Sequence, residues 1–239
     1  MVSVLLVSPR SGESVAHAEY NDVLRATGLS PEQLTQRMLD TAEATVGSLE
    51  GFDGVIVGGS PLNVTNDSYD QWQLQVHSEL QKLIDAPLPV FFICYGTALA
   101  ISLTGGTVER SHPEASGPTI VQLTVEGKQD RITRDLPAEF SSLTGHIESA
   151  ESLGHGVTLL ATGPTCPIQM VRINSSTWAC QFHAEMDAAA MKTRMDFYFD
   201  YGYFTPEDYD SIVAMLPYID TTHSNKVLQN FVEVCRNNR

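Results

Sequence analysis

The chain has 239 residues, of which 42% are hydrophobic and 18% are charged, a composition typical of a globular protein with a well-filled core. Its formal net charge of −15 and its 14 scattered basic residues argue against binding to nucleic acid or to anionic membranes. No apolar run reaches the roughly 18 residues that a membrane span needs, and residues 2–7 follow no basic leader. We therefore expect one domain, spanning residues 1–239, in the cytoplasm.

The cysteines predict reduced thiols rather than disulfides. Four are too few for a disulfide framework in a chain of this size, and none forms a C-x-x-C pair. We expect no metal and no cofactor. The four are Cys94, Cys166, Cys180 and Cys235.

The first half of the chain alternates between short strands and helices. We predict strands at residues 4–7 and 54–57, a helix start at Ser30-Pro31-Glu32 and a helix at residues 71–84. Residues 89–94 are apolar throughout, as expected for a central strand that is buried on both faces. This alternation is typical of parallel strands joined by crossover helices.

The second half adds strands at residues 119–125, 157–161, 168–173 and 177–182. From residue 188 the composition shifts to helix formers, and Thr205-Pro206-Glu207 marks another helix start. The predicted fold class is α/β. It has a mostly parallel mixed sheet flanked by helices over about residues 1–187, and a helical C-terminal extension over about residues 188–239.

Cys94 is the first candidate for chemistry. It ends the apolar strand and precedes Tyr95, Gly96 and a helical segment, which is the pattern of a strand–turn–helix elbow. Such a turn exposes the side chain and directs helix N–H groups at it, which favours the thiolate. A lone cysteine in a strand is more often a buried core thiol, so the rest of the sequence must decide between the two interpretations.

Two further segments supply what a nucleophilic cysteine needs. The strand at residues 177–182 leads into His183, and Glu185 follows two residues later. A histidine held by a carboxylate can take and return a proton, although His-x-Glu alone is weak evidence. The turn Gly58-Gly59-Ser60-Pro61 can present backbone N–H groups to an oxyanion, or it is a plain turn.

Together these motifs resemble one family. The order Gly-Gly-Ser-Pro, Pro-Val-Phe-Phe-Ile-Cys-Tyr-Gly, Cys-Pro-Ile-Gln-Met and Gln-Phe-His-Ala-Glu is similar to class I glutamine amidotransferases, which have a flavodoxin-like fold. The similarity is greatest to stand-alone proteins that resemble the glutaminase domain of GMP synthase, and it extends over roughly residues 1–187.

The resemblance implies a Cys-His-Glu triad of Cys94, His183 and Glu185. It also implies an oxyanion hole at the backbone of Gly59 and Tyr95, and it matches His146 to a position that is often histidine in the family. In that family the thiolate attacks the side-chain amide of glutamine, and water then releases glutamate from a γ-glutamyl thioester. The candidate oxyanion and substrate-binding residues are Gly58, Gly59, Ser60, Tyr95, Gly96, Thr97, Ala98 and His146.

The elbow departs from the family pattern G-[apolar]-C-x-G-H-Q at three positions. Phe92 replaces the first glycine, where it either reshapes the pocket wall or points into the core. Thr97 replaces the histidine, and Ala98 replaces a glutamine that helps to hold the substrate. We therefore expect an intact triad with an altered substrate-binding shell.

The leading hypothesis is a cysteine amidohydrolase that cleaves glutamine or a related γ-glutamyl amide and releases ammonia, or passes it to a separate synthetase. One alternative is a γ-glutamyl amine or peptide hydrolase with a remodelled pocket, and the other is a non-catalytic regulatory protein that kept the fold. The chain lacks the Ser-Gly-Gly-x-Asp-Ser loop of the GMP synthase ATP pyrophosphatase, so alone it is not expected to be a complete GMP synthase. The resemblance leaves a homodimer open.

Overall fold

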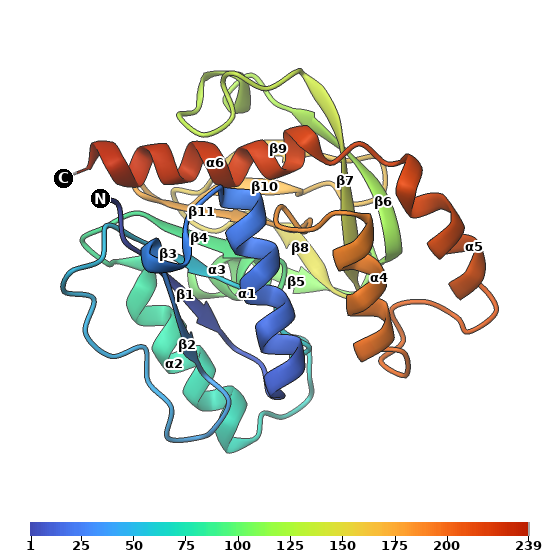
Figure 1. Ribbon diagram of the computed structural model, residues 1–239, viewed down its shortest axis with the longest axis horizontal. Coiled ribbons are helices and arrows are strands. Elements are labelled where there is room, and N and C mark those ends of the chain that lie inside the picture. The colour runs from blue at the N-terminus through green and yellow to red at the C-terminus, as the bar shows by residue number, and fades with distance from the viewer. Residues whose placement is uncertain (239) are drawn as a thin grey trace.

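A nine-stranded sheet runs through the molecule in the order β2-β1-β3-β4-β11-β10-β9-β6-β7 (Figure 1). The computed structural model describes residues 1–238. On one side of the sheet five neighbouring strands run parallel to one another. These are β2 (Leu34–Met38), β1 (Val4–Ser8), β3 (Gly54–Val57), β4 (Val90–Ile93) and β11 (Thr177–Cys180).

The other side of the sheet is antiparallel from β11 outward. The predicted mixed sheet flanked by helices is therefore confirmed, with its parallel strands grouped in one half. The antiparallel strands are β10 (Met170–Arg172), β9 (Thr158–Thr162), β6 (Glu114–Leu123) and β7 (Glu139–His146), and a separate pair is formed by β5 (Thr107–Glu109) and β8 (Ser149–Ser152).

Helices cover both faces of the parallel half because successive strand residues point to opposite faces. Val4 and Leu6 of β1 pack in the cluster that contains α1 (Glu13–Thr27) and α6 (Thr222–Asn237), which lie in front of the sheet in Figure 1. Leu5 and Val7 pack in the opposite cluster. That second face is covered by α2 (Gln71–Ile84) and α3 (Tyr95–Leu103).

Two predicted helix starts differ from the structure. Ser30 and Gln33 form a capping box, but the helix is a single 3-10 turn, Pro31–Gln33. The chain then extends as β2, because residues 34–38 pair in register with β1 and carry no helical apolar repeat. The second start, at Thr205-Pro206-Glu207, is early, since α5 (Tyr209–Met215) begins after a turn.

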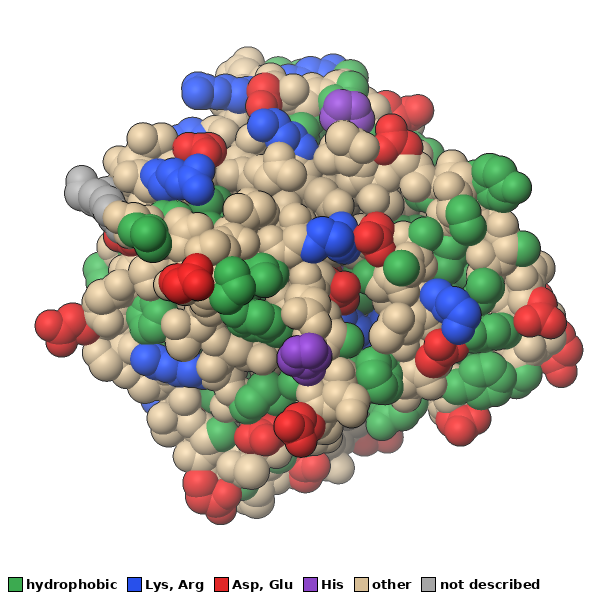
Figure 2. Space-filling view, in the orientation of Figure 1, with side chains coloured by type: hydrophobic (Ala, Val, Ile, Leu, Met, Phe, Trp, Pro, Cys, Tyr) green, Lys and Arg blue, Asp and Glu red, His purple; other side chains and the backbone are tan. Residues whose placement is uncertain are grey.

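The helical C-terminal region, predicted as an extension, is part of the core. Val227, Leu228 and Phe231 of α6 are fully buried in the same cluster as the strands of the sheet. The α4 helix (Ala188–Phe197) and α5 form a third cluster with Leu143 of β7. Figure 2 shows hydrophobic side chains among acidic ones over this region. The large exposed ones are Phe197, Phe199, Tyr201, Met215 and Tyr218.

Short 3-10 turns at Gly127–Gln129 and Leu216–Tyr218 complete the described elements. Over residues 1–238, none of the helices combines the length and the apolar character that a membrane crossing needs.

Candidate active site

Cys94 occupies a sharp turn between β4 and α3. Its backbone has φ 55° and ψ −103°, and it is the only non-glycine residue with a positive φ in the described part of the chain. Such a conformation persists only where its surroundings enforce it. Here the Cys94 N–H donates to the carbonyl of Cys180 at 2.7 Å, which ties the elbow to the neighbouring strand.

Phe92 points into the core rather than into the pocket. It is 1% exposed and packs with the residues beneath α3. A Cβ atom at Gly96 would lie 2.7 Å from Phe92 Cδ1, so the small residue at 96 makes room for the large one at 92. This resolves the two interpretations of Phe92 and gives Gly96 a packing role.

The neighbouring strand β11 brings the histidine and the carboxylate to Cys94. Since β4 and β11 are adjacent and parallel, their carboxyl ends meet at one edge of the sheet. His183 Nδ1 lies 2.8 Å from Glu185 Oε1, and the His183 side chain is also hydrogen-bonded to Cys94. Glu185 is fully buried and His183 is nearly so. The three predicted triad residues are thus in contact.

The charges of this group favour a protonated His183. Burial alone would lower the pKa of His183, but the Glu185 carboxylate and Cys94 outweigh it and raise the pKa to about 10. Burial opposes ionisation of Glu185 too, but His183 lowers its pKa below the ordinary value. At neutral pH the imidazolium can therefore stabilise a thiolate and deliver a proton to a leaving group.

The glycine-rich turn after β3 lies against this group. A Cβ atom at Gly59 would lie 3.1 Å from His183 Cε1 and 3.8 Å from Cys94 Cβ. The Gly58 N–H donates to the carbonyl of Val7 and so is used within the sheet. Tyr95 begins α3, where backbone N–H groups have no helical partner. Gly59 and Tyr95 are therefore the candidate oxyanion donors, and Gly58 is not.

A buried arginine fixes the orientation of this turn. Arg10 Nη2 donates to the carbonyl of Gly59 and lies 2.7 Å from Glu19 Oε1, and Glu19 also accepts a hydrogen bond from Ser8. Burial alone would lower the pKa of Arg10, but Glu19 raises it above its ordinary value. Arg10 Nη1 donates to the Tyr198 hydroxyl at 3.0 Å, linking the turn to the C-terminal region.

Two recesses open on either side of Cys94. Ser60, Gly145 and Tyr203 line both. The first, called here the polar recess for its polar side chains, is also lined by Leu62, Asn63, Tyr95, Ala98, His146, Ile147, Glu148 and Gln181. The second, called the apolar recess, is also lined by His183, Arg10, Arg194, Met186, Met191, Met195, Tyr198 and Phe204.

Comparison with known proteins identifies the family of this chain. The family model for class I glutamine amidotransferases matches residues 19–200. The chain belongs to this family. GMP synthase (glutamine-hydrolyzing) of Bacillus anthracis is 32% identical over 134 residues, which are 56% of this chain and 24% of that protein. The match thus spans about a quarter of such curated relatives.

Solved amidotransferase structures share the fold. A glutamine amidotransferase from Thermotoga maritima superposes with a TM-score of 0.74 at 16% identity, covering 98% of this chain and 99% of that one. A putative GMP synthase subunit from Thermoplasma acidophilum gives a TM-score of 0.66 at 22% identity, covering 99% and 95%. At these identities the likeness establishes the architecture of an amidotransferase.

The elbow's departures from the amidotransferase pattern fall in different places. Ala98 lines the polar recess, as expected of the position where the family has its substrate-holding glutamine. Thr97 is fully buried and does not line either recess, and its hydroxyl has no hydrogen-bond partner among residues 1–238. Of these two departures, only Ala98 is therefore positioned at a recess beside Cys94.

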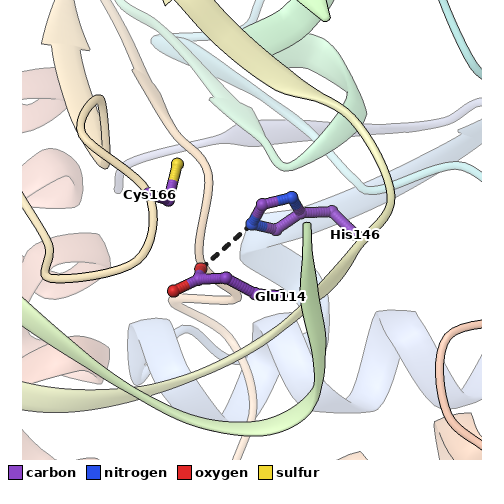
Figure 3. A group of neighbouring side chains, drawn as sticks. All are labelled: Glu114, His146 and Cys166. Atoms are coloured by element: carbon purple, nitrogen blue, oxygen red, sulfur yellow. Dashed lines mark hydrogen bonds and ion pairs between the residues drawn. The ribbon is translucent and has the colours of Figure 1, made fainter. Parts of the chain in front are cut away.

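His146 is held in the polar recess by a second carboxylate (Figure 3). Its Nε2 lies 3.0 Å from Glu114 Oε2, and Glu114 also accepts hydrogen bonds from Thr119, Thr144 and Gln169. Cys166 completes a group whose ligand atoms lie within 4.8 Å of one another. Burial raises the pKa of Cys166 to about 12, and Glu114 is occupied by donors. The group therefore suits a network that orients His146 better than a metal site.

Sequence reasoning missed Arg10 and Gln181. Gln181 Nε2 lies 3.8 Å from Cys94 Sγ, and Gln181 precedes His183 by two residues in the segment that follows β11. That spacing was a usable signal. Arg10 had none, since its partners Glu19, Gly59 and Tyr198 come from three separate segments.

We predict that iodoacetamide labels Cys94 first. The other three thiols are completely buried, and burial raises the pKa of Cys235, like that of Cys166, to about 12 and that of Cys180 well above its ordinary value. Cys94 instead borders two recesses. Peptide mapping after one equivalent of reagent should find the label on Cys94, and slower labelling there than at the other cysteines would contradict the elbow assignment.

Proposed function

We propose that the protein is a cysteine amidohydrolase that cleaves the side-chain amide of glutamine or a related γ-glutamyl amide. The observation that carries this proposal is the contact of Cys94, at a strained elbow, with the buried His183–Glu185 pair. Cys94 follows β4 directly, the segment after β11 carries the other two groups, and membership of the amidotransferase family agrees with this chemistry.

In the first half of the reaction the Cys94 thiolate attacks the γ-carbonyl carbon. The oxygen that gains negative charge is placed to accept hydrogen bonds from the backbone N–H groups of Gly59 and Tyr95. His183 donates its proton to the nitrogen as the carbon–nitrogen bond breaks, leaving a γ-glutamyl thioester on Cys94. Glu185 keeps the imidazole oriented and stabilises its positive charge.

The second half returns the site to its starting state. The neutral His183 takes a proton from water, and the resulting hydroxide attacks the thioester carbon. The carbon–sulfur bond then breaks, which releases glutamate and restores the thiolate and the imidazolium. Each atom of the cycle is supplied by the substrate, by water or by the triad, so the proposed reaction requires no cofactor.

The names of the relatives suggest which partner could accept the released ammonia. The GMP synthases are named as glutamine-hydrolysing, and the Thermoplasma acidophilum protein is named as part of a GMP synthase. We propose by analogy that a separate synthetase accepts ammonia from this chain. A weakened hold on glutamine at Ala98 would favour a γ-glutamyl amine or peptide hydrolase over a glutaminase that supplies a synthetase. A non-catalytic role would leave the strain at Cys94 and the His183–Glu185 contact without a purpose.

Ammonia release from glutamine, with Ala98→Gln as the diagnostic variant, tests this proposal. We expect weak glutaminase activity in the wild type. Ala98→Gln should raise kcat/KM for glutamine about tenfold, because one regained polar contact contributes about 1.4 kcal/mol in the transition state. Ala98→Leu fills similar space without a polar group and should not raise it.

Robust wild-type hydrolysis that Ala98→Gln leaves unchanged would show that other residues hold glutamine. Absence of hydrolysis of every γ-glutamyl amide tried, in protein that is folded and labelled at Cys94, would reject the enzymatic function itself.

A further inference from the structure

The position of His183 assigns the two recesses to the two halves of the substrate. The leaving nitrogen takes its proton from His183, so the amine must lie in the recess that His183 lines. That is the apolar recess. The polar recess, which contains His146, Glu148 and Gln181 but not His183, is left for the glutamyl half.

The walls of the apolar recess are unsuited to ammonia alone. Three methionines and Phe204 line it, each at most 8% exposed. Ammonia and water gain nothing from apolar walls, whereas an alkyl or thioether chain does. The cavity has a volume of about 40 Å³, room for roughly three water molecules, and unbranched methionine side chains can shift to admit a larger group. The three are Met186, Met191 and Met195.

One cation in this recess is weakly neutralised. Arg194, on α4, is 7% exposed, and its Nη2 makes no hydrogen bond with residues 1–238. The same Nη2 atom forms a long ion pair with Asp22 Oδ2, at 3.5 Å. Burial raises the pKa of Asp22 to about 7, against the lowering effect of Arg194, so this carboxyl is only partly charged at neutral pH. Arg10, the other guanidinium, is already bonded to Glu19 and Gly59.

A buried guanidinium whose Nη2 forms one long ion pair and no hydrogen bond can bind a further carboxylate. Arg194 lies beside apolar walls, on the side of Cys94 from which the leaving group departs. These features fit a leaving group that carries an amine, a carboxylate and an apolar chain. We propose that the leaving amine is an apolar α-amino acid, and that the substrate class is γ-glutamyl dipeptides with an apolar C-terminal residue. This inference rests on the proposed amidohydrolase function and specifies its substrate.

The reaction balances without another reactant. Cys94 Sγ bonds to the γ-carbonyl carbon while the carbon–nitrogen bond to the second residue breaks, and that nitrogen leaves with the proton from His183. The free amino acid departs from the apolar recess. Water then hydrolyses the thioester to glutamate, as for a simple amide.

The test compares three substrates of the full chain: γ-glutamylmethionine, its analogue γ-glutamyl-3-(methylthio)propylamide, which lacks the C-terminal carboxylate, and glutamine. We expect kcat/KM for γ-glutamylmethionine to be at least tenfold higher than kcat/KM for glutamine. It should also be about tenfold higher than kcat/KM for the analogue. In Arg194→Met the preference for the dipeptide over the analogue should disappear. Because both rates come from one variant, any general effect on the triad cancels in their ratio.

The control variant is Arg236→Met, which alters an exposed arginine on α6 that pairs with Glu233 and does not line the recess. It should keep the wild-type ratio. Should Arg194→Met fail to fold, the wild-type comparison and Arg194→Lys, which keeps the charge, still test whether the C-terminal carboxylate is recognised. Equal wild-type rates on the dipeptide and its analogue, or glutamine as the best of the three, would overturn the inference while leaving the amidohydrolase proposal intact. Failure to cleave all three would overturn both.

Discussion

Replacing His183 by alanine is expected to lower kcat for γ-glutamyl amide hydrolysis by about 10³-fold, within the range for loss of a general acid–base. In the proposed cycle the imidazole makes two proton transfers, and no other histidine is hydrogen-bonded to Cys94 in the described residues. Glu185→Gln should cause a smaller loss, because the carboxylate orients and stabilises the imidazolium without moving a proton. Initial-rate assays with a γ-glutamyl substrate measure both.

The pH profile provides an independent check on the same pair. In the wild type the leaving group loses its proton donor as pH rises through the raised pKa of His183, about 10. Without the Glu185 carboxylate that pKa falls, so the alkaline limb of kcat/KM should move to lower pH in Glu185→Gln. Near wild-type turnover in folded His183→Ala, or an unmoved limb in Glu185→Gln, would contradict the proposed roles.

The second large effect is expected from the double variant Arg10→Met/Glu19→Met. Arg10 holds the Gly59 carbonyl, and this hydrogen bond restricts rotation of the Gly59 backbone, whose N–H is the proposed oxyanion donor. Loss of Arg10 therefore frees the turn that presents an oxyanion donor, which should reduce kcat about 10²-fold. Removing both charges avoids the buried, unpaired Glu19 that a single substitution would leave, and paired removal is often close to neutral in stability.

Thermal unfolding and steady-state kinetics together measure this effect. The double variant should keep a cooperative transition and rapid Cys94 labelling while kcat falls. Arg37→Met is the matched control, since Arg37 also donates to loop carbonyls, those of Val46 and Ser48, away from the site. A double variant that is stable and retains the wild-type kcat would show that the turn holds its orientation without Arg10.

Short sequence patterns predicted the elements and site residues whose positions depend on neighbouring residues in the chain. The helix Gln71–Ile84 was predicted with its observed bounds, because an apolar repeat and the N-cap Asp70 act over a few residues. Cys94 and His183 were found because each follows an apolar strand. The strand β2 and the core position of α6 were not predicted, since both depend on pairing with distant segments.

The parts of the site that were missed depend on distant segments in the same way. The apolar recess is assembled from β1's end, the segment after β11, α4 and the turn at residues 203–204. A methionine or arginine on a helix carries no sign of which loop it will face in the fold. The triad could be predicted from two short motifs, whereas the substrate-selecting surface became visible only with the chain folded.

The order of the strands also bears on when the candidate site can assemble during synthesis. β11 lies between β4 and β10 at the middle of the sheet. The helix α6, which covers one face of these strands, comes after α4 and α5 in the sequence. Cys235 of α6 packs so closely on Gly54 that a Cβ there would lie 2.2 Å from its sulfur. A growing chain that ends before α6 leaves this face of the central strands exposed, and such late, long-range pairing is slow. We therefore expect the contact between Cys94 and His183 to become stable only after α6 has been made.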